Sequence, residues 1–275
     1  MKLKVEHTTT FTYDLPVHET ATEVRMEPLE PIDPGNRLVA YCLDFQLHLS
    51  PRPTRVSRYI DFYGNKVHNF NLLQSHKKLE ISAQILVETD NTPIDFSDDI
   101  VLREEFMLES RFVEIGPAIR EFADQFARIN HVMGKCEAIC TGVYNMLAYE
   151  RGVTQVGSSS THAMEVGSGV CQDFAHVMIA ACRYLRIPAR YVSGYLYGGS
   201  NTDAFDRASH AWVEVYSGPN EGWVPLDPTH NRHRITNYYI KVGSGRDYAD
   251  VSLIRGTYKG NADETMEAIV RITSV

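Results

Sequence analysis

A cysteine after a glycine-rich turn is the first residue in this sequence whose type and position suggest chemistry. Residues 167–171 read Gly-Ser-Gly-Val-Cys, and apolar residues then recur at the spacing of a helix. Cys171 is therefore predicted in the first helical turn, where unpaired N–H groups and the helix dipole favour a thiolate. The same N–H groups could receive an oxyanion. A buried, inert thiol is the alternative interpretation.

A histidine on a predicted strand is the second candidate. Residues 210–216 alternate, so His210 shares a face with Trp212 and Glu214, whereas the opposite face is small and apolar and is expected to pack inward. A histidine on a rigid strand beside an aromatic ring can act as a base and then as an acid. Taken alone, such a histidine is more often structural.

An aspartate ends the next predicted strand, residues 223–227, and Pro228 fixes an extended exit. Turn residues 217–220 separate this strand from the one before it, which predicts a hairpin with Asp227 near His210. A carboxylate there would orient the imidazole and stabilise its cation. Asp-Pro by itself usually marks only a turn, so the specific feature is the order cysteine, histidine, aspartate on helix, strand, strand.

The chain that must position these residues divides into two parts. Before residue 90 the pattern is that of strands, with alternation at residues 22–26, 43–49 and 79–87, a hairpin turn at 63–65 and a loop at 28–35. A boundary is expected near residues 90–102.

Beyond the boundary a helical spacing begins. It is carried by Ile119, Phe122, Phe126 and Ile129, and then by residues 140–147. The helix that starts at Cys171 is expected to reach residue 185, because Pro188 stops it. Strands are predicted at 189–196, 210–216 and 223–227, and again from residue 238 onward, including 268–272.

Composition excludes few functions. A formal net charge of -8 and a pI near 5.8 argue against a general nucleic-acid binder. No apolar segment resembling a secretion signal follows the first residues, and no run reaches the length of a membrane helix. Five cysteines without signature spacing fit reduced thiols. A cytoplasmic protein without membrane contact is therefore expected.

The region from about residue 158 to 229 resembles the transglutaminase-like superfamily of papain-type cysteine enzymes. The resemblance is strongest around Cys171, His210 and Asp227, the candidate trio. It covers most of the chain more weakly. Its strongest motifs are residues 169–176 (GVCQDFAH), 209–214 (SHAWVE) and 223–229 (WVPLDPT). Residues 194–196, 245–251 and 63–67 are similar to the bacterial branch of that superfamily.

This resemblance implies an α+β fold. A β-rich, sandwich-like N-terminal domain, residues 1–98, would precede a papain/transglutaminase-like catalytic domain, residues 99–275, whose nucleophile-bearing helix packs on an antiparallel sheet. It also implies that Cys171 is the nucleophile, His210 the base and Asp227 its orienting partner. No cofactor is expected.

The expected activity is acyl transfer through a thioester on Cys171. Water as the acceptor gives a peptidase or amidase acting on a peptide or protein, which is the favoured outcome. An amine as the acceptor gives a protein-glutamine transglutaminase that cross-links. A non-catalytic binding module that keeps the fold is the rival from another class. Oligomeric state is not predictable from these residues.

Several neighbours of the trio are weaker candidates. Gly169, Gln172 and Trp212 are candidates for contacts with substrate or oxyanion. Asp173 is expected to turn outward and bond the preceding loop, because a carboxylate facing the sulfur would disfavour the thiolate. His176 lies about 140° around the helix from Cys171 and is expected to serve packing.

Metal binding is mostly set aside. Cys136 and Cys140 share a helical face, but His131 is their only nearby third ligand, so buried thiols are expected, as for Cys182. His230 and His233 could reach one metal only if their segment coiled, and a metal-dependent hydrolase there is a third reading. No serine nucleophile elbow, phosphate loop or dinucleotide fingerprint is present.

Overall fold

The computed structural model describes residues 1–29, 39–90, 100–153, 157–199 and 209–275. Most of the predicted loop at 28–35 and most of the predicted boundary at 90–102 lie outside these ranges. None of the helices in them is long and apolar enough to cross a membrane.

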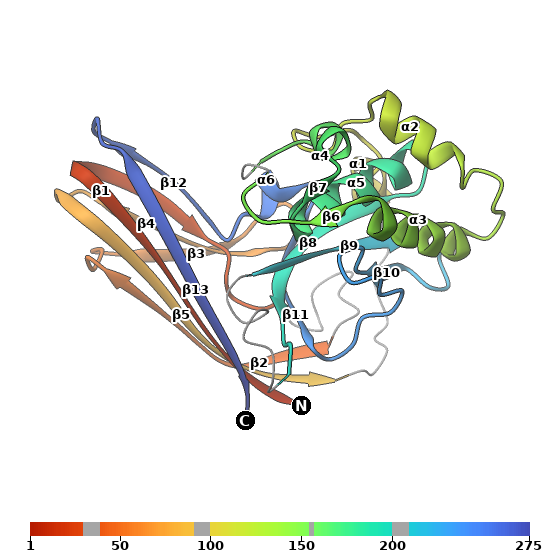
Figure 1. Ribbon diagram of the computed structural model, residues 1–275. Helices are drawn as coiled ribbons and strands as arrows, with labels where there is room; N and C mark the ends of the chain where they lie inside the picture. The colour runs from red at the N-terminus through yellow and green to blue at the C-terminus, as the bar shows by residue number, and fades with distance from the viewer. Residues whose placement is uncertain (30–38, 91–99, 154–156, 200–208) are drawn as a thin grey trace.

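A curled antiparallel sheet forms the N-terminal part (Figure 1). Its central strand β1 (Lys2–Val24) buries every second side chain over its first eight residues, and this alternation explains the strand. The first half of β1 pairs with β5 (His76–Asp90), and its second half pairs with β4 (Lys66–Leu72). Beyond them lie β2 (Val39–Ser50), which pairs with β5, and β3 (Val56–Ile60), which pairs with β4.

The predicted turn at residues 63–65 is confirmed. It joins β3 to β4, and Gly64 has a φ of 84°. Residues with a side chain rarely adopt this backbone conformation, so glycine suits the position. Asp61 N–H donates to the Asn65 carbonyl at 3.0 Å and closes the turn.

The last two strands join this N-terminal sheet. Strands β12 (Ile254–Lys259) and β13 (Glu264–Ser274) both pair antiparallel with β1, which brings the chain termini together (Figure 1). The predicted domain 99–275 therefore does not keep all of its strands in its own sheet. Alternation predicts that residues 268–272 form a strand, but it carries no information about which strand is the partner.

The second sheet carries the candidate residues. Its strand order is β10 (Trp223–Leu226), β9 (His210–Tyr216), β8 (Ala189–Leu196) and β11 (Tyr239–Gly245). Helix α5 (Cys171–Tyr184) packs on this sheet through a shared apolar core. The predicted inward face of β9 is confirmed, since Ala211, Val213 and Val215 belong to that core.

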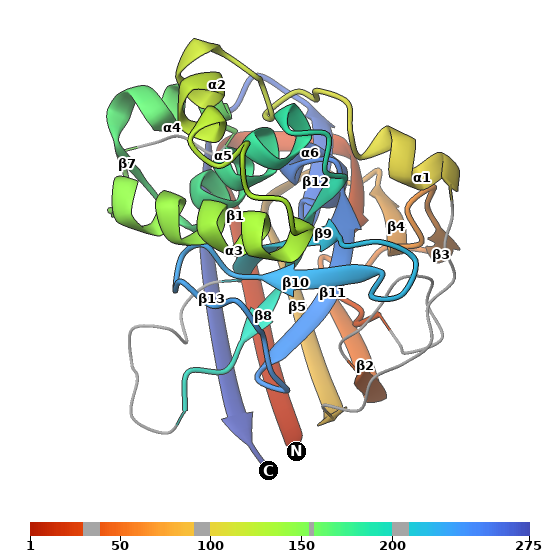
Figure 2. The same ribbon diagram turned by 90° about the vertical axis from the view of Figure 1, so that its right-hand side faces the viewer.

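Helices α2 (Pro117–Asp124), α3 (Val132–Met146) and α4 (Ser160–Val166) pack against α5, as does the short strand β7 (Ser168–Gly169), which pairs with β6 (Ala148–Tyr149). Helix α6 (Tyr248–Val251) packs on β8 and β11, and α1 (Ile100–Glu105) lies away from α5 (Figure 2). The predicted helix through Phe126 and Ile129 is wrong beyond Asp124. There, turns closed by Phe126 N–H to Ala123 O and Ile129 N–H to Phe126 O reproduce the three-residue spacing.

The N-terminal sheet supports the back of the second sheet. Tyr195, Ile240 and Val242 lie in the same apolar core as residues of β1 and β5. The Tyr195 hydroxyl is 3.0 Å from Nδ1 of His7, and burial lowers the pKa of His7 to about 4. These contacts hold β8 and β11 in place, and therefore also β9 beside them.

Gly194 is the tightest point of this arrangement. It lies opposite His210 in the β8–β9 pair, and a Cβ there would be 2.1 Å from the Ile240 carbonyl oxygen and 2.6 Å from the Trp212 ring. We expect Gly194→Ala to lower the free energy of unfolding by about 1–3 kcal/mol, as overpacking does, measured by urea denaturation.

Gly134→Ala in α3 is the matched control for Gly194→Ala. The nearest atom to its Cβ would be 3.7 Å away. Alanine favours a helix over glycine, so this variant should gain about 0.5–1 kcal/mol. Equal stability of Gly194→Ala and the wild type would contradict the packing argument.

Candidate active site

Cys171 is the first residue of α5, as the glycine-rich turn predicts, and its side chain is half-buried. Val170 precedes the helix in an extended conformation, and its N–H donates to Oδ2 of Asp173 at 2.8 Å. Gly169 must lack a side chain because its Cβ would lie 2.5 Å from that same oxygen. The turn, the cap and the helix together fix the cysteine at the positive end of α5.

Asp173 is predicted correctly in one respect and wrongly in another. It bonds the preceding loop through Val170, but it does not turn outward, since it is only 1 % exposed. The reason is that the backbone at residues 169–170 leaves space for a carboxylate there and offers it an N–H donor. Its charge is used in capping the helix.

His210 begins β9 and lies beside both other members of the trio. Its Nε2 is 2.8 Å from Oδ2 of Asp227, and Cys171 is close enough to be one of the neighbours that raise the pKa of the ring. With Nε2 on the carboxylate, Nδ1 is the ring nitrogen left for the sulfur. Burial opposes protonation of the ring, but the charge and hydrogen bond of Asp227, with Cys171, outweigh it and raise the pKa of His210 to about 10.

Asp227 follows β10 and is fully buried. Antiparallel pairing of β9 and β10 sets it beside His210, as the hairpin predicts. Its Oδ1 accepts the N–H groups of Thr229 at 2.9 Å and His230 at 3.3 Å. Burial alone would raise the pKa of this carboxyl, but His210 and His230 hold it well below its usual range.

Two further side chains bind the same carboxylate oxygen, and sequence reasoning missed both. Nδ1 of His230 lies 2.8 Å from Oδ2 of Asp227, and the Tyr239 hydroxyl donates to Oδ2 at 2.7 Å. Three donors thus converge on one oxygen. His230 follows Asp227 by three residues. A turn at Asp227-Pro228 would have predicted its contact with that carboxylate. No local pattern points to Tyr239, because β11 reaches the site through the sheet.

Trp212 is a supporting residue in this structure rather than one that a substrate can touch. It is fully buried, and its ring stacks on His210 with centroids 6.3 Å apart and packs against Tyr239 at 5.3 Å. Gln172 is half-buried in the first turn of α5, and Gly169 is buried behind it. Of the three candidate substrate contacts, only Gln172 has a side chain that is partly accessible.

His230 and His233, the pair mostly set aside as metal ligands, bind different partners. His230 binds Asp227, whereas Nε2 of His233 lies near the Thr141 hydroxyl and Oδ1 of Asn231. Among the described residues, a different group, His210, Asp227 and His230, has ligand atoms that all lie within 4.8 Å of one another. Both imidazoles are already hydrogen-bonded to that carboxylate, so the group is explained without an ion.

The other candidate side chains lie where packing was predicted. Cys136, Cys140 and Cys182 are free, fully buried thiols in the core under α5. His176 is fully buried between aromatic rings, and its Nε2 accepts the Tyr248 N–H at 3.2 Å. His131 caps α3 by accepting the N–H of Gly134.

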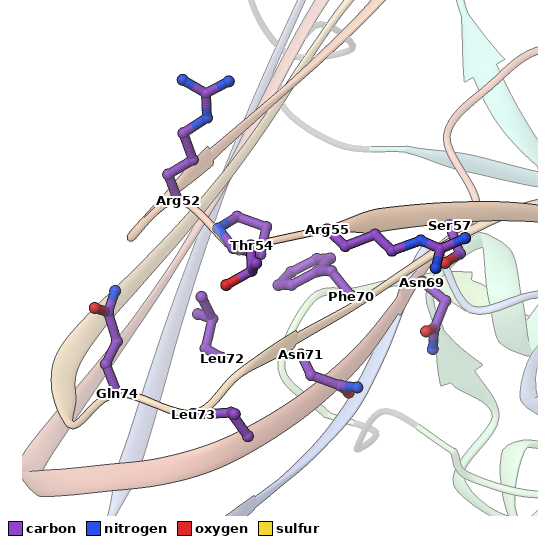
Figure 3. Close-up of a pocket in the computed structure, with 11 residues that line it drawn as sticks. Arg52, Thr54, Arg55, Ser57, Asn69, Phe70, Asn71, Leu72, Leu73 and Gln74 are labelled. Atoms are coloured by element: carbon purple, nitrogen blue, oxygen red, sulfur yellow. The ribbon is translucent and has the colours of Figure 1, made fainter.

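A cavity of about 420 Å³ lies elsewhere, on the N-terminal sheet (Figure 3). No cysteine, histidine or carboxylate is among its lining residues, which are Arg52, Pro53, Thr54, Arg55, Ser57, Asn69, Phe70, Asn71, Leu72, Leu73 and Gln74. None of the three candidate residues Cys171, His210 and Asp227 lines this cavity.

Comparisons with known proteins identify the family. Residues 120–228 match the transglutaminase-like superfamily, and residues 3–88 match the bacterial transglutaminase-like N-terminal region. The uncharacterized protein ML0607 of Mycobacterium leprae is 30% identical over 285 residues, covering 99% of this chain and 98% of that protein. The uncharacterized protein Rv2569c of Mycobacterium tuberculosis is 30% identical over 260 residues, 86% of this chain and 82% of its own. The chain belongs to the transglutaminase-like superfamily.

A solved structure supports the same conclusion. A protein from Cytophaga hutchinsonii, provisionally described as a cysteine protease, superposes with a TM-score of 0.77 at 26% identity. The match covers 100% of this chain and 91% of that one. The predicted fold class, a β-rich N-terminal part followed by a transglutaminase-like core, is confirmed.

Proposed function

We propose that this protein is a cysteine-nucleophile acyl-transfer enzyme whose trio is Cys171, His210 and Asp227. The observation that carries the proposal is the 2.8 Å contact of buried Asp227 with His210, whose other neighbour with an influence on its pKa is Cys171 at the start of α5. A buried carboxylate on one ring nitrogen leaves the other nitrogen to take a proton from the sulfur. The half-buried cysteine at a helix N-terminus is accessible to a carbonyl substrate.

The first half of the reaction forms a thioester. His210 accepts the thiol proton, and the sulfur of Cys171 forms a bond to the carbonyl carbon of a peptide or carboxamide. The backbone N–H of Cys171 stabilises the oxyanion. His210 then gives its proton to the departing amine as the C–N bond breaks. Asp227 keeps the imidazolium oriented throughout.

The second half regenerates the thiol. Water, activated by His210, attacks the thioester, the C–S bond breaks, and a carboxylic acid leaves. An amine in place of water would give a new amide instead. The trio is the same for both acceptors. We favour water, and therefore a peptidase or amidase, and the resemblance to the C. hutchinsonii protein supports that preference.

The decisive experiment separates the two acceptors. The wild type and Cys171→Ala are incubated with a peptide library and a labelled amine, and products are identified by mass spectrometry. Cleaved or deamidated peptides that require Cys171 support hydrolysis. Glutamine peptides that carry the labelled amine would instead show transglutaminase activity in place of hydrolysis. Products that are equal in both proteins would sink the proposal.

A binding module that keeps the fold is tested by alkylation. We expect iodoacetamide to modify Cys171 at a rate that has already reached its plateau below about pH 7, as for an ion pair with His210. An ordinary thiol would instead show a rate that rises through about pH 8–9. Cys42, half-buried on the N-terminal sheet, is the internal reference in the same mass spectrum.

The metal-dependent reading is tested by chelation. Because both imidazoles near Asp227 are held by hydrogen bonds, we expect turnover and alkylation to be unchanged after treatment with a strong chelator. Loss of both, with recovery on adding zinc, would favour the metal reading.

A further inference from the structure

A short parallel ribbon fixes Tyr149 beside the nucleophile. In the pair β6–β7, Ala148 lies opposite Ser168 and Tyr149 lies opposite Gly169, two residues before Cys171. Glu150 N–H donates to the Gly169 carbonyl at 2.9 Å, and Ala148 N–H to the Gly167 carbonyl at 3.0 Å. Paired strands are about 4.8 Å apart, so the Tyr149 backbone lies next to the turn that delivers Cys171.

The side chain of Tyr149 packs against a residue in the first turn of α5. Its ring centroid is 6.3 Å from that of Phe174. Phe174 follows Cys171 by three residues, and residues with this spacing are neighbours on one helix face. The Tyr149 ring therefore lies near the turn of α5 that begins with Cys171.

Tyr149 is also accessible. It is 52% exposed, whereas Phe174 beneath it is 1% exposed. Val153 and Val166, at 37% and 41% exposure, come from the two segments that the ribbon joins. Isolated exposed apolar residues need no explanation. This tyrosine differs because its position is fixed by backbone hydrogen bonds at the rim of a reactive thiol.

We propose that Tyr149 forms one wall of the acyl-donor subsite and selects substrates with an apolar or aromatic side chain near the scissile carbonyl. This inference rests on the proposed function. A tyrosine ring offers a large, rigid contact area at low entropic cost, and such residues dominate recognition. Buried Trp212 cannot offer such a contact, whereas Tyr149 is exposed and pairs with the turn that leads to Cys171.

The test uses two chloromethyl ketones, acetyl-phenylalanyl and acetyl-glycyl, which differ only in the side chain. The sulfur of Cys171 displaces chloride, forming a C–S bond, and intact-protein mass spectrometry follows the rate. In the wild type we expect the phenylalanyl reagent to react about tenfold faster or more, the size of a typical recognition contact. Tyr149→Ala should bring the two rates together, and Tyr149→Phe should keep the preference.

Tyr144→Ala is the matched control, because Tyr144 is 45% exposed on α3 and lies outside the ribbon. It should keep the wild-type ratio. Iodoacetamide, which has no side chain to recognise, should modify Cys171 equally in all four proteins and so report an intact trio. A preference that survives in Tyr149→Ala overturns the inference and leaves the proposed function standing. A Cys171 that reacts with iodoacetamide as an ordinary thiol overturns both.

Discussion

The Cys171→Ala variant is expected to lose turnover by on the order of 10⁵-fold while remaining folded. Both halves of the reaction need the sulfur, first to form the thioester and then as the leaving group when it breaks. Removing a nucleophile that acts as a unit with its base costs nearly as much as removing the whole trio. Turnover of a peptide found by the library screen is the measurement.

Folding should be almost unaffected by this change, because Cys171 is half-buried at a helix start and alanine is a strong helix former. Cys182→Ala is the contrasting variant. It removes a fully buried thiol of the α5 core, so stability should fall while the reacting groups stay in place. If Cys171→Ala retained turnover within tenfold of the wild type, the covalent mechanism would be excluded.

Local sequence carries most of the information that assembles the trio. The turn before Cys171, the alternation around His210 and the strand that ends at Asp227 each define one element, and only a short hairpin joins the last two. The structure has β8 at residues 189–196 and β9 at residues 210–216, as predicted. The positions of these three residues therefore depend little on strand pairings between distant parts of the chain, and local patterns are enough to predict them.

Apart from His230, which follows Asp227 by three residues, the contacts that sequence reasoning missed arise from long-range pairing. Tyr239 reaches Asp227 because β11 lies next to β8, and β12 and β13 reach β1 from the far end of the chain. The alternation in a strand predicts which of its faces is apolar, but not which other strand it pairs with. Asp173 was misplaced for a related reason, since its burial depends on the missing side chain of Gly169.

Asp227→Asn is expected to lower turnover by about 10⁴-fold, the cost of the wrong imidazole tautomer. An asparagine amide has one acceptor atom and one donor atom. If its NH₂ group takes the place of Oδ2, it faces His210, His230 and Tyr239, which all donate there. If the amide flips, the NH₂ group faces two backbone N–H groups instead. Neither orientation leaves Nδ1 of His210 reliably free to accept a proton.

The same variant should be less stable by about 3–5 kcal/mol near pH 6, because it breaks a buried charged pair. Glu80→Gln is the control. Its carboxylate pairs with Lys78, and both side chains are exposed, so its loss should cost at most about 1 kcal/mol. Urea denaturation of the three proteins measures both differences.

The pH dependence of that difference tests whether His210 is charged in the folded protein. Burial opposes protonation, but Asp227, helped by Cys171, raises the pKa of His210 from 6.5 to about 10, so the stabilisation is fully present below pH 6.5 and is lost as the pH rises through about 10. The pKa of Asp227 is depressed from 3.8, so the same stabilisation is present above that value and is lost as the pH falls below it. The stability gap between wild type and Asp227→Asn should therefore be widest between about pH 4 and 6.5 and should narrow steadily toward pH 10. A gap that stays constant from pH 6 to 10 would mean that the imidazole beside Cys171 is neutral, and the ion pair that activates the sulfur would then be absent.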